Sequence, residues 1–295
     1  QTNNELIWIN AGHPSITAHK TRQDRFDQVC GLFTHELGHV LHTDFLTSQT
    51  YHSYQEAGRW YPEEPPLRSS VERYAAAEYL DMLGNDPENR KLLTSISHEI
   101  LNVLEDGYIE QRMITDYPGV LGSSLQARRA SSFAEMPDLA QIIEAEPEGG
   151  HIWLTILQTI LSYMKWGEIK YGGTPLTDER VQVVFSMLSA LDQALVSPDF
   201  RDRCRAANLI LIRCWPHIVD FMDFCKSQAQ NASDSGGDGD ADSVLQRMLA
   251  ALAGSSCGAS GETAPVEGAA GSGSTGGTAG APTAKRRAAT AKLAE

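Results

Sequence analysis

The sequence places two histidines and a glutamate at a spacing that can hold and use a metal ion. Residues 35–39 read His-Glu-Leu-Gly-His, within a segment, 23–43, whose apolar residues recur at helical intervals. Residues four apart lie on one face of a helix, so the imidazoles of His35 and His39 can reach one ion. Glu36 adjoins the first histidine, where its carboxylate can accept a proton from metal-bound water. The motif therefore predicts a zinc (Zn2+) site with Glu36 as its catalytic base.

A catalytic zinc ion normally takes three protein ligands, so a second helix must supply one more. The pattern over residues 88–114 predicts a long helix in which Glu105 shares a face with Ile109 and Met113. A carboxylate on a buried face is costly unless it is paired or bound to a metal. We therefore expect Glu105 to be the third ligand, and we keep Asp106 as the alternative.

Other polar residues of this predicted helix have different expected roles. Asp106 lies nearer to Glu99 and Glu110, on an acidic stripe that has the pattern of a solvated surface. Asn102 falls on the face expected to be buried, where its amide can hydrogen-bond beside the ion.

The surrounding pattern is mostly helical and includes one strand. Residues Glu5–Asn10 read as a short N-terminal strand that ends before Ala-Gly-His-Pro. Helical patterns recur at 23–43, 69–83, 88–114, 137–144, 151–166, 177–195 and 199–226. The segment 23–43 carries an apolar stripe formed by Phe26, Val29, Cys30, Phe33, Leu37, Val40 and Leu41. The expected fold is mainly α (α+β), with a metal-binding core over residues 1–120 and a helical extension of the same body over 121–226.

The composition changes after residue 226. Residues 227–295 contain no aromatic residue but hold 12 of the chain's 25 glycines. Such a segment buries too little apolar surface to offset its conformational entropy, so we expect a disordered linker or tail. The piece from Val244 to Leu252 has helical spacing, which is consistent with either a transient or a docking helix.

The composition also argues against some functions and compartments. With 24 Lys and Arg against 38 Asp and Glu, the net charge is −14, which disfavours generic nucleic-acid binding. No window of 18 apolar residues lacks charges, so no membrane span is expected. The five cysteines form no Cys-x-x-Cys pair, which favours reduced thiols in the cytoplasm.

Two segments together resemble a known family. They are His35–Phe45 (His-Glu-Leu-Gly-His-Val-Leu-His-Thr-Asp-Phe) and Asn102–Glu110 (Asn-Val-Leu-Glu-Asp-Gly-Tyr-Ile-Glu). They resemble the zincin-type metallopeptidase region of bacterial and phage proteins that carry a von Willebrand factor A domain, including cobaltochelatase-T-like proteins. The resemblance covers roughly residues 5–115. It implies a zincin-like core with zinc on His35, His39 and Glu105, and it leaves the choice between Glu105 and Asp106 open.

The resemblance also implies partners. The A domain's Asp-x-Ser-x-Ser motif is absent from this sequence, so that domain would lie beyond Glu295 in a longer parent chain. The leading expectation is a zinc-dependent peptidase that hydrolyses a peptide or protein substrate with water activated by Glu36. The alternative is a non-proteolytic metal-binding scaffold that acts with the A domain and an ATPase partner. The intact Glu36 favours the peptidase, because a scaffold needs only the ligands.

Overall fold

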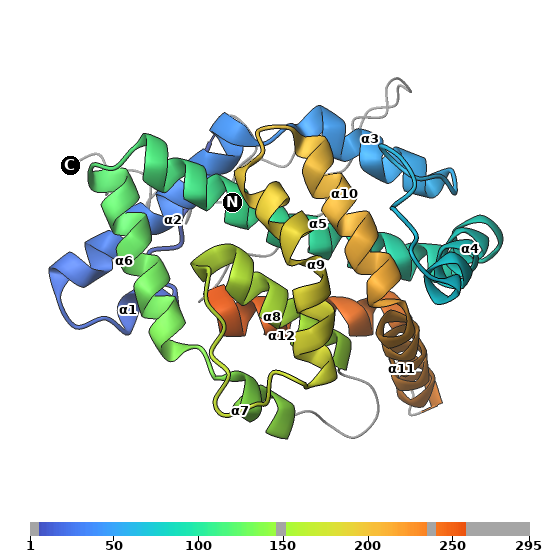
Figure 1. Ribbon diagram of the computed structural model, residues 1–295. Coiled ribbons are helices and arrows are strands. Elements are labelled where there is room, and N and C mark those ends of the chain that lie inside the picture. The colour runs from blue at the N-terminus through green and yellow to red at the C-terminus, as the bar shows by residue number, and fades with distance from the viewer. Residues whose placement is uncertain (1–5, 146–151, 235–239, 258–295) are drawn as a thin grey trace, which may run out of the picture. The chain divides into compact units, whose positions relative to one another are not determined.

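The computed structural model describes residues 6–145, 152–234 and 240–257, which form an array of α-helices (Figure 1). The described helices belong to one compact unit. They are α1 (Pro14–Thr17), α2 (Arg22–His42), α3 (Phe45–Glu56), α4 (Ser70–Asn85), α5 (Pro87–Asp116), α6 (Val120–Glu135), α7 (Leu139–Glu144), α8 (Ile152–Trp166), α9 (Glu179–Val196), α10 (Phe200–Arg213), α11 (Trp215–Asp234) and α12 (Ala241–Cys257).

The expected α+β zincin-like core is wrong. The described residues contain no sheet, and residues 6–10 of the predicted Glu5–Asn10 strand lie outside any helix and form no strand. An alternating apolar pattern makes a strand only where a neighbouring strand can satisfy its backbone hydrogen bonds. Among residues 6–10, Ile7 has an isolated bridge-type backbone pairing that does not extend along the segment, so no strand forms there.

Helix α5 is the element around which the others pack. Its start is defined by Asp86, whose side chain accepts hydrogen bonds from the backbone N–H groups of Glu88 and Asn89, with Pro87 in the first turn. It is 30 residues long, which corresponds to about 45 Å. Helices α2, α3, α4, α6, α8, α9, α10 and α12 all contact it. Side chains are therefore buried around most of its circumference, polar as well as apolar.

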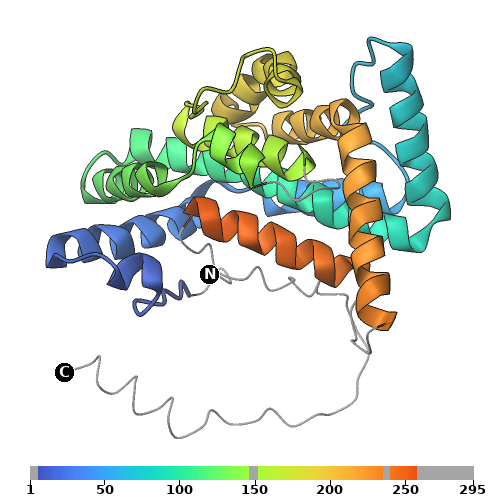
Figure 2. The same ribbon diagram turned by 90° about the horizontal axis from the view of Figure 1, so that it is seen from below.

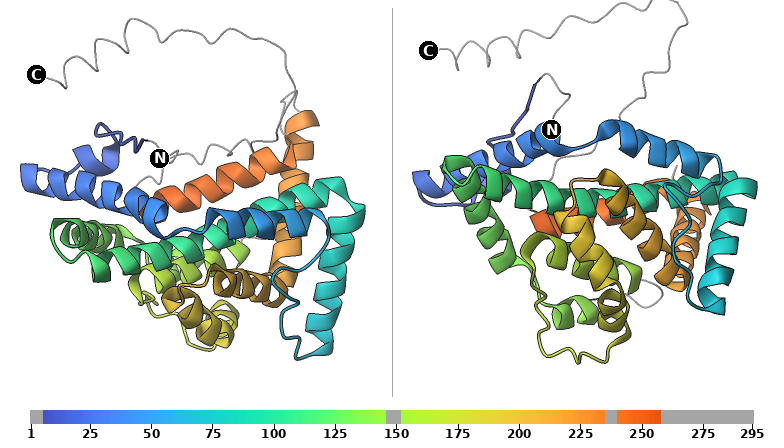
Figure 3. Two further views of the ribbon diagram at one scale, coloured as in Figure 1. Left: turned by 90° about the horizontal axis from the view of Figure 1, so that it is seen from above. Right: turned by 45° about the horizontal axis from the view of Figure 1, so that its top comes forward.

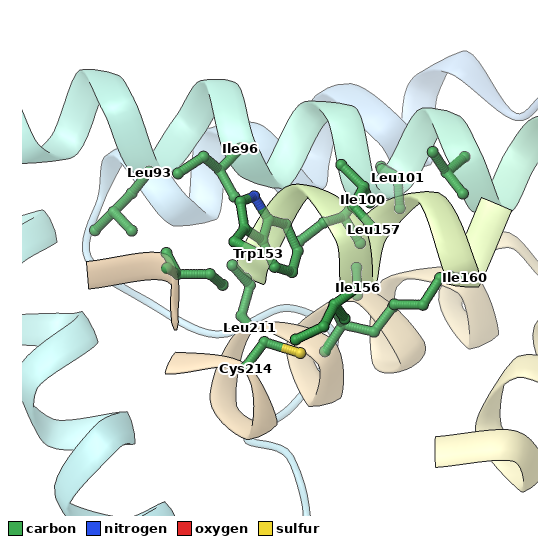
Figure 4. Packing of buried hydrophobic residues seen from close by; sticks show 14 of the residues in the cluster. Leu93, Ile96, Ile100, Leu101, Trp153, Ile156, Leu157, Ile160, Leu211 and Cys214 are labelled. Carbon is green, nitrogen blue, oxygen red and sulfur yellow. The ribbon is translucent and has the colours of Figure 1, made fainter. Parts of the chain in front are cut away.

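The apolar core lies mainly between α5, α8 and α10. Trp153, Ile156 and Ile160 of α8 are fully buried, and Figure 4 shows them between residues of α5, such as Ile96 and Ile100, and the end of α10. Helix α8 is rich in apolar residues because neighbours enclose it on most sides. Even so, within the described ranges no helix has both the length and the apolar character needed to span a membrane.

Helix α2 buries a different face from the one that carries its apolar stripe. Phe26, Phe33 and Val40 of that stripe are exposed, with 51%, 38% and 40% of their surface accessible. The buried residues of α2 are small or polar: Gln28, Gly31, Thr34 and Gly38. The small residues let neighbouring helices approach, above all α6, which the sequence pattern did not predict and which lies alongside α2 (Figure 3).

The expectation of disorder from residue 227 onward does not hold for residues 227–234 and 241–257. Helix α11 extends to Asp234, and α12 packs against α11, α5 and α8 (Figure 2). Val244, Leu245 and Leu249 of α12 are buried, so the short apolar periodicity is sufficient to attach this helix to the core. The rest of the predicted tail, residues 258–295, lies outside the described residues.

Candidate metal centre

The two motif histidines lie one turn apart on α2 and turn their rings toward α5. Thr21 caps the start of α2, where its side chain accepts a hydrogen bond from the backbone N–H of Asp24. The ring centroids of His35 and His39 are 5.0 Å apart and the ring planes are nearly perpendicular, at 86°. The four-residue spacing thus brings both imidazoles to one side of the helix.

Asp106 of α5 is the carboxylate that meets these histidines. Its Oδ1 lies 3.3 Å from Nε2 of His39 and 3.8 Å from Nε2 of His35. Among the described residues, His35, His39 and Asp106 form the group of His, Cys, Asp or Glu side chains that could hold a metal ion. One ligand atom from each of the three lies within 4.8 Å of the other two. Tetrahedral zinc with bonds of about 2.0–2.1 Å separates its ligand atoms by roughly 3.3 Å, so the set is of the right size for one ion.

Burial of Asp106 opposes its ionisation. The hydrogen bond from His39 and the charges of His35 and His39 outweigh that burial, and they hold the pKa of Asp106 below its ordinary value. The carboxylate is therefore charged at neutral pH, as a metal ligand must be.

Glu105, the residue expected to be the third ligand, points to other partners. Its Oε1 accepts a hydrogen bond of 2.8 Å from the hydroxyl of Thr43, and its Oε2 pairs with Arg203 of α10. Burial raises the pKa of Glu105, although Arg203 and Thr43 oppose that effect. Successive residues of a helix project about 100° apart, so Glu105 and Asp106 face different neighbours. The geometry supports Asp106, the alternative that the sequence left open.

Glu110 contacts Nδ1 of His35, the ring nitrogen that does not face Asp106. Its Oε1 lies 3.0 Å from Nδ1 of His35 and 3.0 Å from Nζ of Lys165, and its Oε2 lies 3.6 Å from Nε of Arg129. Burial disfavours the charge on Glu110, but Lys165, His35 and Arg129 outweigh it and place the pKa far below its ordinary value. An ionised carboxylate only accepts hydrogen bonds, so Nδ1 of His35 is the donor in this contact.

The environment of each histidine fits a metal ligand. Both imidazoles direct Nε2 toward Asp106 and have a partner at Nδ1, which is Glu110 for His35 and Thr43 for His39. Metal-binding histidines commonly donate their second ring N–H to a carboxylate or another acceptor, which orients the ring. With Nδ1 of His35 protonated, its Nε2 carries the free electron pair that a metal needs.

Glu36 lies on α2 beside both histidines and is half-buried. Residues three apart are neighbours on a helix surface, so Glu36 flanks His39. Burial lowers the pKa of His39, but Asp106, Glu105 and Glu36 together outweigh it and raise that pKa. Glu36 therefore sits in the electrostatic environment of the ligands, as the proposed role of a base requires.

Gly38 permits the close approach of the two helices that carry the site. A Cβ atom at this position would lie 3.0 Å from Cγ of Met113 and 3.2 Å from Cδ1 of Ile109, both on α5. Such contacts are tighter than ordinary van der Waals packing. The absence of a side chain thus lets α2 lie against α5 at the level of His39 and Asp106.

Other polar residues singled out by the sequence lie elsewhere. Asn102 hydrogen-bonds Glu99, whose pKa is raised to about 7 by burial and by the charge of Asp106. His98 faces His52 of α3, with 3.3 Å between their ring nitrogens. Glu110 of the acidic stripe is buried, and Glu99 and Asp106 are half-buried, so the stripe is not the solvated surface that its pattern indicated.

Thr43, Glu110, Lys165 and Arg203 are residues of this centre that sequence reasoning missed as site residues. Lys165 carried a usable signal, because it ends a strongly apolar helix and a buried ammonium needs a carboxylate partner. Arg203 carried a similar signal among the apolar residues of α10. Neither signal identifies the carboxylate with which the basic residue pairs, because each ion pair joins two helices that are distant in the sequence.

Comparison of the chain with protein-family models, curated proteins and solved structures finds no match. The functional argument therefore rests on the residues and their geometry.

Proposed function

We propose that this protein is a zinc-dependent hydrolase of peptide bonds, with His35, His39 and Asp106 as the metal ligands and Glu36 as the general base. The observation that carries the proposal is the convergence of Nε2 of both histidines on Oδ1 of Asp106. The spacing of Glu36 between the histidines supports catalysis over mere metal storage.

The donor set supports zinc over other common ions. Two imidazole nitrogens and one carboxylate oxygen are a ligand set found in catalytic zinc sites, which keep a further position for water or substrate. Calcium and magnesium prefer oxygen ligands throughout. The side chains of His35, His39 and Asp106 keep 12%, 23% and 18% of their surface accessible, so solvent still reaches part of the centre.

A bound zinc ion would supply Lewis acidity to the substrate carbonyl and to the attacking water. Glu36 would accept the proton of that water at its carboxylate as the oxygen adds to the carbonyl carbon. The same proton would then pass from Glu36 to the amide nitrogen as the carbon–nitrogen bond breaks. Glu36 ends the cycle deprotonated, so the net reaction consumes one water and releases a carboxylic acid and an amine.

Metal analysis of protein purified without chelators, from cells grown with zinc, tests the ligand set. We expect about one zinc per chain, and its loss in His35→Ala and His39→Ala. His98→Ala is the matched control, because it removes a histidine of α5 that lies outside the centre, and it should keep its zinc. A zinc-free wild type would contradict the proposal.

A peptide-library cleavage assay tests the reaction. Glu36→Gln keeps the shape of the side chain and should keep zinc, while hydrolysis falls by about two to four orders of magnitude. Cleavage that survives in Glu36→Gln would remove Glu36 from the mechanism. Stoichiometric zinc without cleavage of any peptide would favour the alternative of a scaffold acting with a von Willebrand factor A domain and an ATPase.

We also propose that the protein works in a reducing compartment such as the cytoplasm. Four cysteines in the described residues are free, and Cys204, Cys214 and Cys225 among them are buried. Burial raises the pKa of Cys204 to about 12, which keeps that thiol protonated and unreactive.

A further inference from the structure

A chain of side chains runs from the proposed ligand His39 to a helix of the predicted 121–226 extension. Nδ1 of His39 lies 3.0 Å from Oγ1 of Thr43, and that oxygen lies 2.8 Å from Oε1 of Glu105. The other oxygen of Glu105 pairs with Arg203 of α10. We infer that Arg203 is a positioning residue that, through Glu105 and Thr43, keeps a hydrogen on Nδ1 of His39 and so orients its ring, an inference that rests on the proposed metal centre.

The direction of these hydrogen bonds follows from the donors present. The hydroxyl of Thr43 has one hydrogen, and the carboxylate of Glu105, ionised against Arg203, can only accept it. The oxygen of Thr43 is then an acceptor toward His39, so Nδ1 of His39 carries a ring hydrogen. While no metal is bound, the carboxylate of Asp106 competes for a ring hydrogen at Nε2, whereas a metal ion on Nε2 would leave the hydrogen on Nδ1.

Arg203 is held rigidly enough to act as the anchor. Its side chain is fully buried, and Nη1 donates a 2.8 Å hydrogen bond to the backbone oxygen of Ser197. The guanidinium carbon lies 3.9 Å from the ring centre of Tyr108 and 4.9 Å from that of Phe200. A buried guanidinium stays protonated and requires a paired anion, so Glu105 is retained as a charged acceptor.

The two histidines are therefore oriented in different ways. His35 donates directly to the carboxylate of Glu110, whereas His39 donates to a hydroxyl that relays to a carboxylate. A direct hydrogen bond to a charged group is stronger than one to a neutral hydroxyl. His39 thus depends on every link of its relay, and Thr43 is the link that a minimal substitution can remove.

The relay is tested on metal-free protein by 15N NMR of the histidine rings. All spectra are recorded in an Asp106→Ala background, which removes the carboxylate that competes for the ring hydrogen at Nε2 and raises the pKa of His39. The pH is about 8.5, and the signals of His39 are those lost in His39→Gln. In this background the chain with Thr43 and the chain with Thr43→Ser should both hold His39 with its hydrogen on Nδ1. Thr43→Val, which has the same shape without the hydroxyl, should shift His39 toward the Nε2–H form.

The second arm changes the anchor. Arg203→Lys keeps the positive charge and should keep the Nδ1–H form of His39, whereas Arg203→Met should lose it. In the chain that keeps Asp106, zinc competition with a chelator should show binding weakened roughly 10–100-fold in Thr43→Val and Arg203→Met, the usual effect of removing a partner of a metal ligand. Thermal melts identify variants that fail to fold. If an Arg203 variant fails to fold, the comparison of Thr43→Val with Thr43→Ser decides the test.

The inference is overturned if Thr43→Val keeps His39 in the Nδ1–H form and binds zinc as tightly as Thr43→Ser. It is also overturned if a folded Arg203→Met behaves as wild type in both measurements. The NMR measurement needs neither zinc nor a substrate. A failure of the proposed peptidase activity therefore leaves this test intact, and a failure of the relay leaves the three proposed ligands in place.

Discussion

Oδ1 of Asp106 lies 3.3 Å from Nε2 of His39. The contact joins α2 to α5 and depends on the packing of both helices, because neither residue is near the other in the sequence. It also distinguishes Asp106 from its neighbour Glu105, whose carboxylate is occupied by Thr43 and Arg203.

Substitutions of these two acidic residues should have unequal effects on zinc binding. Asp106→Ala removes a ligand and should prevent stoichiometric zinc binding, since two histidines alone leave the site short of donors. Glu105→Gln should keep zinc with affinity reduced roughly 10–100-fold, because it weakens only a partner of a ligand. Zinc content and chelator competition measure both. Glu88→Gln, an exposed carboxylate at the start of α5, is the control, and equal losses in Asp106→Ala and Glu105→Gln would argue against the assignment.

The buried pair of Glu110 and Lys165 should make stability fall in acid. The pKa of Glu110 is depressed in the folded state, so the unfolded chain binds the proton more readily. The contribution of Glu110 is complete above its ordinary value of 4.5 and is lost as the pH falls below it. Urea unfolding between pH 7 and pH 3 should show this loss, with a smaller dependence in Glu110→Gln.

Glu110→Gln should also lower the free energy of unfolding at pH 7 by about 3–5 kcal/mol, because Lys165 is left buried without its charged partner. The control is Asp116→Asn, which removes a partly exposed carboxylate that pairs with Arg112 on the same helix. Its effect should stay within about 1 kcal/mol. A result for Glu110→Gln as small as that of the control would show that the buried pair contributes little.

Gly38→Ala should disturb the metal centre through the helix contact. The added Cβ would press on Met113 and Ile109, which we expect to lower the free energy of unfolding by about 1–3 kcal/mol. Separation of α2 from α5 should also weaken zinc binding. Gly84→Ala is the control, because a Cβ there meets no atom within 4 Å and should be neutral or slightly stabilising. Zinc binding unchanged in Gly38→Ala would mean that the close approach is not needed for the site.

Helix α12 should contribute to the stability of the whole unit. Leu245 is fully buried, so Leu245→Ala should lower the free energy of unfolding by about 2–5 kcal/mol. Gln246→Ala, on the exposed side of the same helix, should have little effect. Urea unfolding of both variants makes the comparison, and two equally stable variants would indicate that α12 is detached from the core in solution.

The sequence was sufficient to single out His35, Glu36 and His39 as candidate site residues. Their mutual placement depends only on the geometry of one helix, which is the same in every protein. The same geometry indicated the 88–114 helix as the source of a third ligand, since it carries an acidic pair at residues 105 and 106.

The geometry of a single helix could not decide whether Glu105 or Asp106 is the better candidate for the third ligand. The sequence argument assumed that an acidic stripe faces solvent and an apolar face is buried, which holds for a surface helix. Helix α5 is enclosed on most sides, so both carboxylates are covered and their roles follow from the neighbours that each one meets. Glu105 meets Arg203 of α10, and Asp106 meets His35 and His39 of α2, and these helices are far from residues 105 and 106 in the sequence.

The sequence by itself determined the local features of this protein: most of its helices, the side of α2 on which both histidines lie, and the identity of the candidate base. These follow from interactions within a few residues, which hydrophobic period, capping and side-chain spacing report directly. The tertiary structure alone decided the all-helical architecture of the described residues, the outward position of the apolar stripe of α2, the attachment of α12 and the placement of Asp106 beside the two histidines. Each of these depends on which surfaces meet when distant segments pack, and no local pattern contains that information.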